Sequence, residues 1–344
     1  MKIFVLHARS RKLGDSLVTA SVIRDFSVAI KSSSKAELVV LLPKTFSPIP
    51  EIYRLKVIYY QNELSALIFA VYLRTIAFSR GRELIFSNIS GHSGCASMIK
   101  WILNPRSWST RCKNEAYGCV DGNRVRRMFS HSSQFEYSEL PLNLLFPDFH
   151  ATRNVFAENR VFRRVDTRVI SISPFSAEKR RSIRIQSLLA LISQCLQHGP
   201  VQLIFNSKDK DYEKDVDECR FRFLNNPSFF LCQCNNLNEL WRALRRSSEV
   251  FVVDSGVYVL AATAGAQVTV IYGPSQPHKT IYNPRSIKSV VRDTRLGENH
   301  CHNNECTEAY CIDSALGRLS AVRLPHPCLL RTNGDSQVNF VRSS

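Results

Sequence analysis

Short apolar runs alternate with longer amphipathic segments along most of this sequence, and this alternation constrains the fold more than any other feature. Residues 2–6 form an apolar run, and the segment after it places Val18, Val22, Phe26 and Ile30 on one face of a helix. Similar apolar runs occupy 38–42, 56–60, 83–87, 168–173, 201–206, 228–234, 249–255 and 267–273. Helical patterns occupy 63–78, 91–103, 187–198, 212–224, 237–247 and 256–264. Strands that alternate with helices predict an α/β fold with parallel sheets covered on both faces.

The alternation occurs twice, and its two halves predict two domains. Between 104 and 164 it gives way to prolines, arginines and other polar residues, which we interpret as an irregular acceptor-side segment and linker. The predicted domains are therefore 1–165 and 166–330, each Rossmann-like, followed by a polar tail at 331–344. Ligands of open parallel sheets bind beyond the carboxyl ends of the strands, so two such edges predict a central cleft between the domains.

The chain carries a formal net charge of +17 over 344 residues. A surplus of this size favours contact with polyanions, and three kinds stay open: nucleic acid, an anionic membrane surface and a phosphorylated glycolipid. A basic protein without any such partner is the remaining alternative. The Arg and Lys residues are scattered over both halves and match no nucleic-acid-binding motif, so specific nucleic-acid binding is not expected.

Two apolar segments and the cysteines bear on where in the cell the protein is located. The run at 3–6 is too short for a signal peptide, and the stretch at 63–78 is shorter than a membrane span of ~20 residues and contains Arg74. We interpret that stretch as a buried or interfacial helix. Eleven scattered cysteines, an odd number, predict no disulfide framework and fit a reducing compartment. We expect a cytoplasmic protein in peripheral contact with the inner face of the cytoplasmic membrane.

The loop at 9–15, between the first strand and the first helix, is the first candidate site. Gly14 permits a sharp turn or a close backbone approach, and Asp15 stands where a helix N-cap belongs. Capping alone would explain Asp15. The functional alternative is a general base that takes a proton from an attacking sugar hydroxyl. Neither Gly-x-Gly-x-x-Gly nor a Walker A motif is present.

Two corners of the second half suit a diphosphate. A buried strand ends at Asp254, and Ser255 and Gly256 then open a helix whose backbone N–H groups and dipole favour an anion. After an earlier strand, Ser176 can donate hydrogen bonds to phosphate, and Lys179 can neutralise a leaving diphosphate. An ordinary strand-turn-helix corner and a solvated basic turn are the respective alternatives.

Two further motifs lie toward the C-terminus. Gly273 and Pro274 follow a buried strand and predict a rigid exit loop. Cys301, Cys306 and Cys311 have a spacing that could ligate a metal, but no fourth ligand at a matching distance is evident. We therefore expect no metal.

These motifs, in this order, resemble glycosyltransferase family 9, the heptosyltransferase family, from the N-terminus to Ala321. The family's Gly-Asp pair and D-x-L-x-T-x-x-x-I-R helix correspond to Gly14, Asp15, Leu17, Thr19, Ile23 and Arg24. Its small-residue loop and Lys-Arg pair correspond to Ser176, Lys179 and Arg180. Its Asp-Ser/Thr-Gly-x-x-His-x-Ala-Ala motif, followed by a strand and Gly-Pro, reads DSGVYVLAA and then VTVIYGP.

The resemblance implies a GT-B fold and an inverting, metal-independent glycosyltransferase without a cofactor. The donor would be ADP-heptose or another nucleotide-diphosphate sugar, bound mainly by the C-terminal domain, and the acceptor a lipopolysaccharide core or related glycan. By the same resemblance, Asp15 would be the catalytic base and Lys179 would contact the donor phosphates. Asp254, Ser255 and Gly256 would line the donor pocket.

The chain departs from the family pattern at three places. Val259 replaces the family His, and Arg181 and Ser182 stand where Trp-Pro is usual. In the second strand-helix corner Asn206 and Ser207 replace frequent glycines, and the ribose-binding acid is one of Asp209, Asp211 and Glu213. These departures leave two alternatives open, a catalytically lapsed GT-B-fold binding protein and another GT-B enzyme with a UDP-sugar donor. The net charge leaves a third, a basic nucleic-acid-binding protein.

Overall fold

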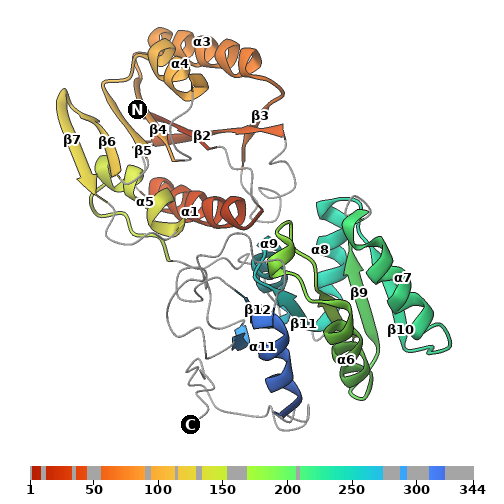
Figure 1. The fold of residues 1–344 in the computed structure, drawn as a ribbon. Helices are drawn as coiled ribbons and strands as arrows, with labels where there is room; N and C mark the ends of the chain where they lie inside the picture. The colour runs from red at the N-terminus through yellow and green to blue at the C-terminus, as the bar shows by residue number, and fades with distance from the viewer. Residues whose placement is uncertain are drawn as a thin grey trace. The chain divides into compact units, whose positions relative to one another are not determined.

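The chain divides into two compact units, Met1–Glu158 and Asn159–Ser344, and each is described by itself (Figure 1). The computed structural model describes residues 2–8, 13–32, 36–44, 56–89, 94–112, 115–128, 134–152, 169–206, 210–273, 287–292 and 310–321. The predicted strands and helices of 2–103 and 168–273 are present within these ranges, with ends shifted by a few residues.

The first unit is built on one mixed sheet. Its strands are β1 Lys2–His7, β2 Ala36–Pro43, β3 Ile58–Tyr60, β4 Glu83–Asn88, β5 Ser107–Cys112, β6 Glu115–Val120 and β7 Asn123–Met128. The spatial order is β3-β2-β1-β4-β5-β6-β7. From β3 to β5 all neighbours are parallel, whereas β6 and β7 pair antiparallel to the strand before them. The predicted parallel sheet is therefore present from β3 to β5, and β6 and β7 extend it with antiparallel strands that were not predicted.

The prediction of an irregular segment at 104–164 is wrong for its described part, which contains β5, β6, β7 and helix α5, Gln134–Leu145. The error has a physical cause, because these strands lack an apolar run. Ser107 and Ser109 are buried in β5, and β7 is exposed along most of its length. Gly118 in β6 lies so close to β5 that a Cβ atom there would be 2.1 Å from the Trp108 carbonyl oxygen. The two strands can approach this closely only with glycine at that position.

Helices cover both faces of this sheet, as the sequence predicts. Alternate side chains of β1 point to opposite faces. Ile3 and Val5 pack in one apolar cluster with α3, Glu63–Ser79, and α4, Gly94–Leu103. Phe4 contacts Phe26 of α1, Leu13–Ser32, and Phe146 just after α5. Figure 1 shows α3 and α4 on one side of the strands and α1 and α5 on the other.

The second unit is built on a parallel sheet. Its strands are β8 Val169–Ser173, β9 Val201–Phe205, β10 Phe229–Gln233, β11 Ser247–Val253, β12 Gln267–Tyr272 and β13 Ile287–Arg292. Every neighbouring pair in the order β10-β9-β8-β11-β12-β13 is parallel. This is the doubly wound order 3-2-1-4-5-6 of dinucleotide-binding folds. The last strand, β13, has no counterpart in the predicted elements.

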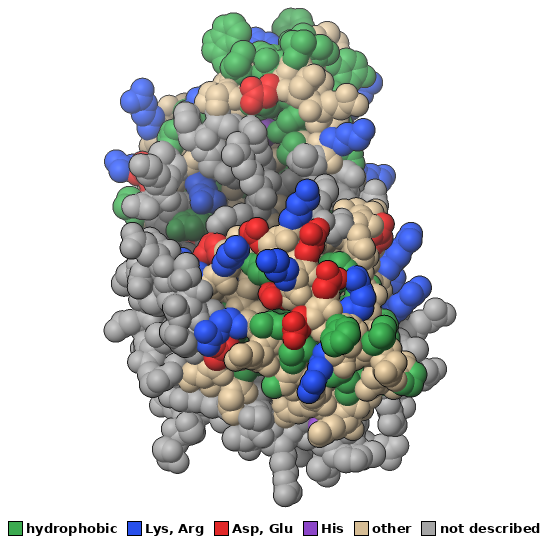
Figure 2. Space-filling model, turned by 45° about the vertical axis from the view of Figure 1, so that its right-hand side comes forward, with side chains coloured by type: hydrophobic (Ala, Val, Ile, Leu, Met, Phe, Trp, Pro, Cys, Tyr) green, Lys and Arg blue, Asp and Glu red, His purple; other side chains and the backbone are tan. Residues whose placement is uncertain are grey.

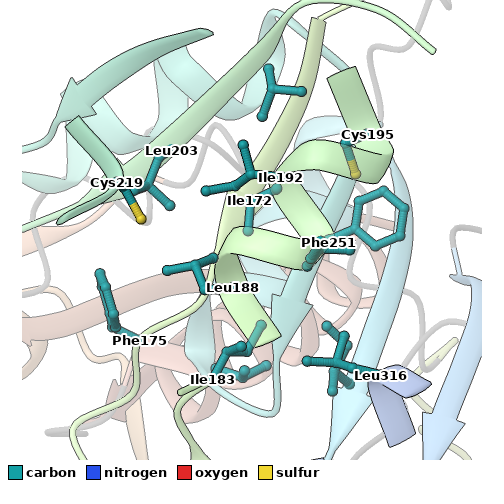
Figure 3. Close-up of a cluster of buried hydrophobic side chains, with 14 of the residues drawn as sticks. Ile172, Phe175, Ile183, Leu188, Ile192, Cys195, Leu203, Cys219, Phe251 and Leu316 are labelled. Atoms are coloured by element: carbon teal, nitrogen blue, oxygen red, sulfur yellow. The ribbon is translucent and has the colours of Figure 1, made fainter. Parts of the chain in front are cut away.

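The helices of this unit also divide between the two sheet faces. They are α6 Ile185–Leu196, α7 Glu213–Arg222, α8 Leu237–Arg245, α9 Gly256–Ala264 and α11 Tyr310–Ala321. Side chains from α6, α7 and α11, including Leu188, Cys219 and Leu316, share one buried cluster with Ile172 and Phe251 of the sheet (Figure 3). Val250 and Val252, the neighbours of Phe251 in β11, are buried on the opposite face of the sheet, where α8 and α9 contact each other. Among the helices within the described ranges, none has the length and hydropathy that a membrane crossing requires.

Each sheet has one point from which successive strands are added on opposite sides. In the first unit the chain progresses outward in opposite directions from β1 and β4, and in the second unit from β8 and β11. Open α/β sheets bind ligands in the crevice beyond the carboxyl ends of these two strands. The candidate ligand-binding residues are therefore those that follow β1 and β4 in the first unit, and those that follow β8 and β11 in the second.

Candidate functional site

A buried polar network lies at the carboxyl ends of the strands of the first unit. His7, the last residue of β1, is buried, and its Nδ1 lies 3.1 Å from Asn88 Oδ1 at the end of β4. Asn88 Nδ2 donates to Thr110 Oγ1 on β5 at 3.1 Å. On the other side, His7 Nε2 lies 3.0 Å from the Tyr60 hydroxyl at the end of β3. Side chains thereby join four strands at or near their carboxyl ends, at the place where this fold binds ligands.

The side-chain amide of Asn88 determines which atoms of this network donate hydrogen bonds and which accept them. Because Asn88 gives its amide hydrogen to Thr110, its Oδ1 is the acceptor toward His7. His7 Nδ1 then carries a proton, and in the neutral ring Nε2 accepts from Tyr60. None of these residues was predicted from the sequence to belong to a site. The only available signal was that His7 and Asn88 are polar residues at the ends of apolar runs.

Asp15 is the third residue of α1 rather than the predicted N-cap, because the helix begins at Leu13. It is partly exposed in the first turn, where the helix dipole favours a negative charge. Gly14 is helical as well and does not have a positive φ, so of the two roles considered for it, a sharp turn or a close backbone approach, the turn is wrong. The residues directly before Leu13, at 9–12, lie outside the described ranges.

Arg111, near the end of β5, interacts electrostatically with Asp15. Its guanidinium carbon lies 4.1 Å from the centre of the Tyr137 ring of α5, a cation–π contact. Burial lowers the pKa of Arg111, while the charges of Tyr137 and Asp15 oppose that shift. Sequence reasoning missed Arg111, because β5 was not predicted. The carboxylate of Asp15 and a half-buried cation therefore share one environment.

In the second unit, an ion pair joins the segment after β8 to the segment after β11, the two strands from which the sheet extends in opposite directions. Arg181 lies in the 3-10 helix η2, Lys179–Arg181, after β8, and Asp254 follows β11 directly. Arg181 Nη1 lies 3.4 Å from Asp254 Oδ2, and its Nη2 lies 3.0 Å from Glu178 Oε1. The Asp254 side chain is only 6% exposed. The Arg181 Nε is buried and has no hydrogen-bond partner among the described residues.

The loop after β8 is held by its own hydrogen bonds. The Ser176 N–H donates to Ser182 Oγ at 2.9 Å, and the Tyr212 hydroxyl donates to the Ser176 carbonyl at 2.9 Å. Ser176 Oγ accepts from the Glu178 N–H at 3.3 Å, which leaves the hydroxyl proton of Ser176 to be donated elsewhere. Phe175 stacks on the Tyr212 ring with centroids 4.3 Å apart. These contacts fix the loop that carries Lys179.

Lys179 itself is an exposed cation at the edge of this loop. Its Nζ lies 3.6 Å from Asp211 Oδ2, and both side chains are largely exposed. An exposed pair of this kind is worth at most about 1 kcal/mol, so a ligand phosphate can compete for the ammonium group. Asp211 lies in the 3-10 helix η3, Lys210–Tyr212, whereas Ser207 and Asp209 lie outside the described residues.

A pocket of about 250 Å³ opens beside this loop, beyond the ends of β8, β9 and β10. It is lined by Phe175, Phe205, Asn206, Tyr212, Glu213, Val216, Asp217, Arg220 and Gln233. The lining combines aromatic rings with carboxylates, amides and one guanidinium, a mixture that suits an aromatic base and a hydroxylated ring. Of the three acids considered for a ribose contact, Glu213 lines this pocket.

The turn after β11 has the predicted form. Ser255 is the N-cap of α9, and its side chain accepts from the Val257 N–H at 3.3 Å. Gly256 is the first residue of the helix, so no side chain covers the backbone there. Val259, where the family pattern has His, is buried and only 1% exposed. In this chain that position contributes to the core of α9.

The remaining candidates lie close to α11 or outside the described ranges. Gly273 follows β12 directly, and a Cβ atom there would lie 3.0 Å from Ile312 Cγ1 of α11, so the position is tightly packed. Pro274, Cys301 and Cys306 lie outside the described residues, and Cys311 is in α11. Within the described ranges, no group of three or more His, Cys, Asp or Glu side chains is placed to hold a metal.

One protein-family model matches the chain, that of glycosyltransferase family 9 (heptosyltransferase), over residues 113–311. No sequence among the curated proteins matches it. The solved structure of the Escherichia coli ADP-heptose lipopolysaccharide heptosyltransferase II is similar, with a TM-score of 0.61, 16% identity, and coverage of 93% of this chain and 98% of that one.

Two other solved structures show the same fold. A family 9 glycosyltransferase from Veillonella parvula has a TM-score of 0.63 at 12% identity, with 93% of this chain and 95% of that chain covered. The E. coli heptosyltransferase WaaC with ADP-2-deoxy-2-fluoro heptose has a TM-score of 0.57 at 12% identity, with 92% and 99% covered. These likenesses establish the GT-B fold predicted from the sequence.

Proposed function

Because the chain belongs to glycosyltransferase family 9, the heptosyltransferases, and is a glycosyltransferase, we propose that it transfers a sugar with inversion from a nucleotide diphosphate to a glycan. The preferred donor is ADP-heptose, since one similar structure contains an ADP-heptose analogue. The preferred acceptor is a lipopolysaccharide core or a related glycolipid. The enzyme acts in the cytoplasm, in peripheral contact with the inner face of the cytoplasmic membrane.

The donor is held by the second unit. Its nucleoside occupies the pocket that Phe175, Glu213 and Gln233 line, and its diphosphate lies over the N-terminus of α9. Backbone N–H groups at Ser255 and Gly256, together with the helix dipole, stabilise the negative charge. Lys179 exchanges its exposed partner Asp211 for a phosphate oxygen, and the hydroxyl proton of Ser176 is donated to another.

The observation that carries the proposal is the position of Asp15, in the first turn of the helix that follows β1 and electrostatically coupled to Arg111. Asp15 takes the proton of an acceptor hydroxyl as that oxygen attacks the anomeric carbon. The bond between this carbon and the phosphate oxygen breaks, and its electrons leave with the diphosphate. Attack from the opposite side inverts the configuration.

The cations and N–H groups of the chain supply the electrostatic assistance for the leaving diphosphate, so the proposed reaction uses no metal and no cofactor. The same interactions grow stronger as charge develops on the diphosphate, which is the condition for catalysis rather than mere binding.

The test is the substitution Asp15→Asn, with Glu63→Gln as the matched control, because Glu63 is a first-turn acid of another helix in the same unit. We expect unchanged donor affinity, since the donor is held by other residues. Turnover should fall by ~10²–10⁴, the usual loss when a general base is removed. Full transfer activity of Asp15→Asn would refute the assignment of the base.

A thermal-shift panel of ADP, UDP, GDP and CMP sugars identifies the donor. A ligand that binds only the folded state raises the melting temperature by mass action, by an amount that depends on its affinity. We expect the largest shift with ADP-heptose. Val259, at the position of the family His, is buried in the core of α9. A larger shift with another nucleotide sugar would correct the preferred substrate.

A further inference from the structure

The outward side of α3 carries large apolar side chains along most of its length. Ala66, Ala70, Leu73 and Ala77 are buried against the sheet, which leaves the opposite side to solvent. That opposite side carries large exposed hydrophobic residues at helical spacing, namely Leu64, Ile68, Val71, Tyr72 and Phe78. Phe78 is 90% exposed. A solvated helix normally presents polar residues on this side.

Helix α4 extends the same surface. Met98 and Trp101 lie three residues apart on its exposed side, and Trp101 is 81% exposed. Arg74 of α3 donates from Nη1 to the Ile102 carbonyl of α4 at 2.6 Å, which holds the two helices together. We call the seven residues Leu64, Ile68, Val71, Tyr72, Phe78, Met98 and Trp101 the α3/α4 face. Figure 2 shows hydrophobic side chains gathered at the top of the view, where α3 and α4 lie.

The charges around the α3/α4 face are mostly positive. Arg74 and Arg80 are exposed, and Lys100 lies with its Nζ 3.8 Å from the centre of the Trp108 ring. Glu63, at the first position of α3, is the single acid of the two helices. Lys and Arg side chains flank the hydrophobic group in Figure 2 as well.

We propose that the α3/α4 face docks the protein on an anionic lipid bilayer, with its apolar side chains inserted at the level of the headgroups. Apolar helix faces with aromatic residues and a cationic border bind membrane interfaces by combining burial of apolar area with attraction to anionic lipid. The inference rests on the proposed function, because a lipid-borne acceptor would require the enzyme to work at such a surface.

A second copy of the chain is the competing occupant, and the charges disfavour it. In a symmetric dimer the same patch faces itself, so Arg74, Arg80 and Lys100 would approach their own counterparts with only Glu63 to balance them. Anionic lipid instead neutralises all three cations. Trp and Tyr side chains such as Trp101 and Tyr72 are also the types enriched at membrane interfaces.

The test compares co-flotation of the full chain with vesicles of phosphatidylcholine alone and with added phosphatidylglycerol. We expect binding to the anionic vesicles, with weaker binding in raised NaCl. The double substitution Phe78→Ser/Trp101→Ser removes two exposed rings and should weaken binding at least about tenfold, given what an apolar side chain gains on burial. Phe221→Ser is the matched control, because Phe221 is an equally exposed ring on α7 of the other unit.

Quenching of tryptophan fluorescence by brominated lipid provides a second measurement on the folded protein. We expect quenching in the wild type that is largely lost in Trp101→Phe, because the other two tryptophans, Trp108 and Trp241, are partly buried. Equal vesicle binding by wild type and Phe78→Ser/Trp101→Ser would overturn the proposal. So would a concentration-dependent dimer that this variant abolishes while the wild type ignores vesicles.

Failure of this inference is distinguishable from failure of the proposed function. Transfer to a water-soluble, lipid-free acceptor should be the same for wild type and Phe78→Ser/Trp101→Ser. Asp15-dependent transfer without vesicle binding would overturn the docking surface alone. Vesicle binding without transfer from any nucleotide sugar would overturn the function alone.

Discussion

The ion pair between Arg181 and Asp254 provides the sharpest prediction, because it joins the loop of Lys179 to the Asp-Ser-Gly turn. At 3.4 Å and an effective dielectric constant of about 20, two unit charges attract by about 5 kcal/mol before desolvation is subtracted. Breaking a buried pair from one side costs about 3–5 kcal/mol. The Arg181 side chain is 25% exposed, so screening by solvent reduces this amount.

We therefore expect Arg181→Met to lower the free energy of unfolding of the second unit by about 2 kcal/mol. For a domain of this size the melting temperature should fall by about 4–8 °C, measurable by differential scanning calorimetry. The donor should bind about tenfold more weakly, because η2 loses its anchor, and isothermal titration would measure this. Met preserves most of the apolar stem, so the change isolates the charge.

The control is Arg180→Met, which removes the neighbouring guanidinium and leaves the pair between Arg181 and Asp254 in place. The double variant Arg181→Met/Asp254→Asn removes both charges and should recover much of the lost stability. A double-mutant cycle then yields the coupling, for which we expect about 1–2 kcal/mol. Strictly additive effects of the two single substitutions would refute the reasoning.

Two other predictions concern the close approach at Gly118 and the thiols of β10. Gly118→Ala should destabilise the first unit by about 3 kcal/mol in chemical unfolding, because its Cβ would overlap backbone atoms of β5. The control is Gly317→Ala, whose Cβ would meet nothing within 4 Å and which should be neutral or stabilising. Equal effects of the two substitutions would contradict the packing argument. A hydrogen bond with Cys234 lowers the pKa of Cys232 to about 7, so its thiolate is lost as the pH falls below that value, whereas burial raises the pKa of Cys219 to about 12. Iodoacetamide labelling, followed by peptide mass mapping, measures the reactivity of each thiol. Labelling of Cys232 should rise through about pH 7, at lower pH than labelling of Cys219, and in Cys234→Ala this rise should move to higher pH. Labelling of both thiols with one pH profile would contradict this.

The elements that the sequence predicts well are the buried parallel strands and the helices between them. A strand buried on both faces is apolar throughout, so runs such as 38–42 and 267–273 are visible without any partner. The strands β5 to β7 are different, because they add to the sheet edge through polar and basic side chains. Ser109, for example, is buried through a hydrogen bond to Ser87 of β4 at 2.9 Å. Such compensation depends on the neighbouring strand and is invisible in a local pattern.

The residues of the candidate site also fall into a group that the sequence pattern predicts and a group that it does not. Asp15, Lys179 and Asp254 lie in or next to the loops that follow predicted strands, so their position in the pattern was enough to select them. Arg181 was seen only as a departure from the family pattern, because its partner Asp254 is 73 residues away in the sequence. The environment of Asp15 was missed with Arg111, since that residue belongs to an unpredicted strand. Contacts between distant segments become visible only when the sheet order is known.

The connections of the second unit divide its candidate donor-binding residues into two groups. The pair of Arg181 and Asp254 depends on the segments after β8 and β11, whereas four of the nine residues that line the pocket, Glu213 and Arg220 among them, belong to α7 after β9. Natural variation along α7 can therefore reshape the pocket while the pair persists unchanged. A lineage with this architecture is free to exchange one nucleoside for another in small evolutionary steps, without rebuilding the part of the protein that holds the negative charge.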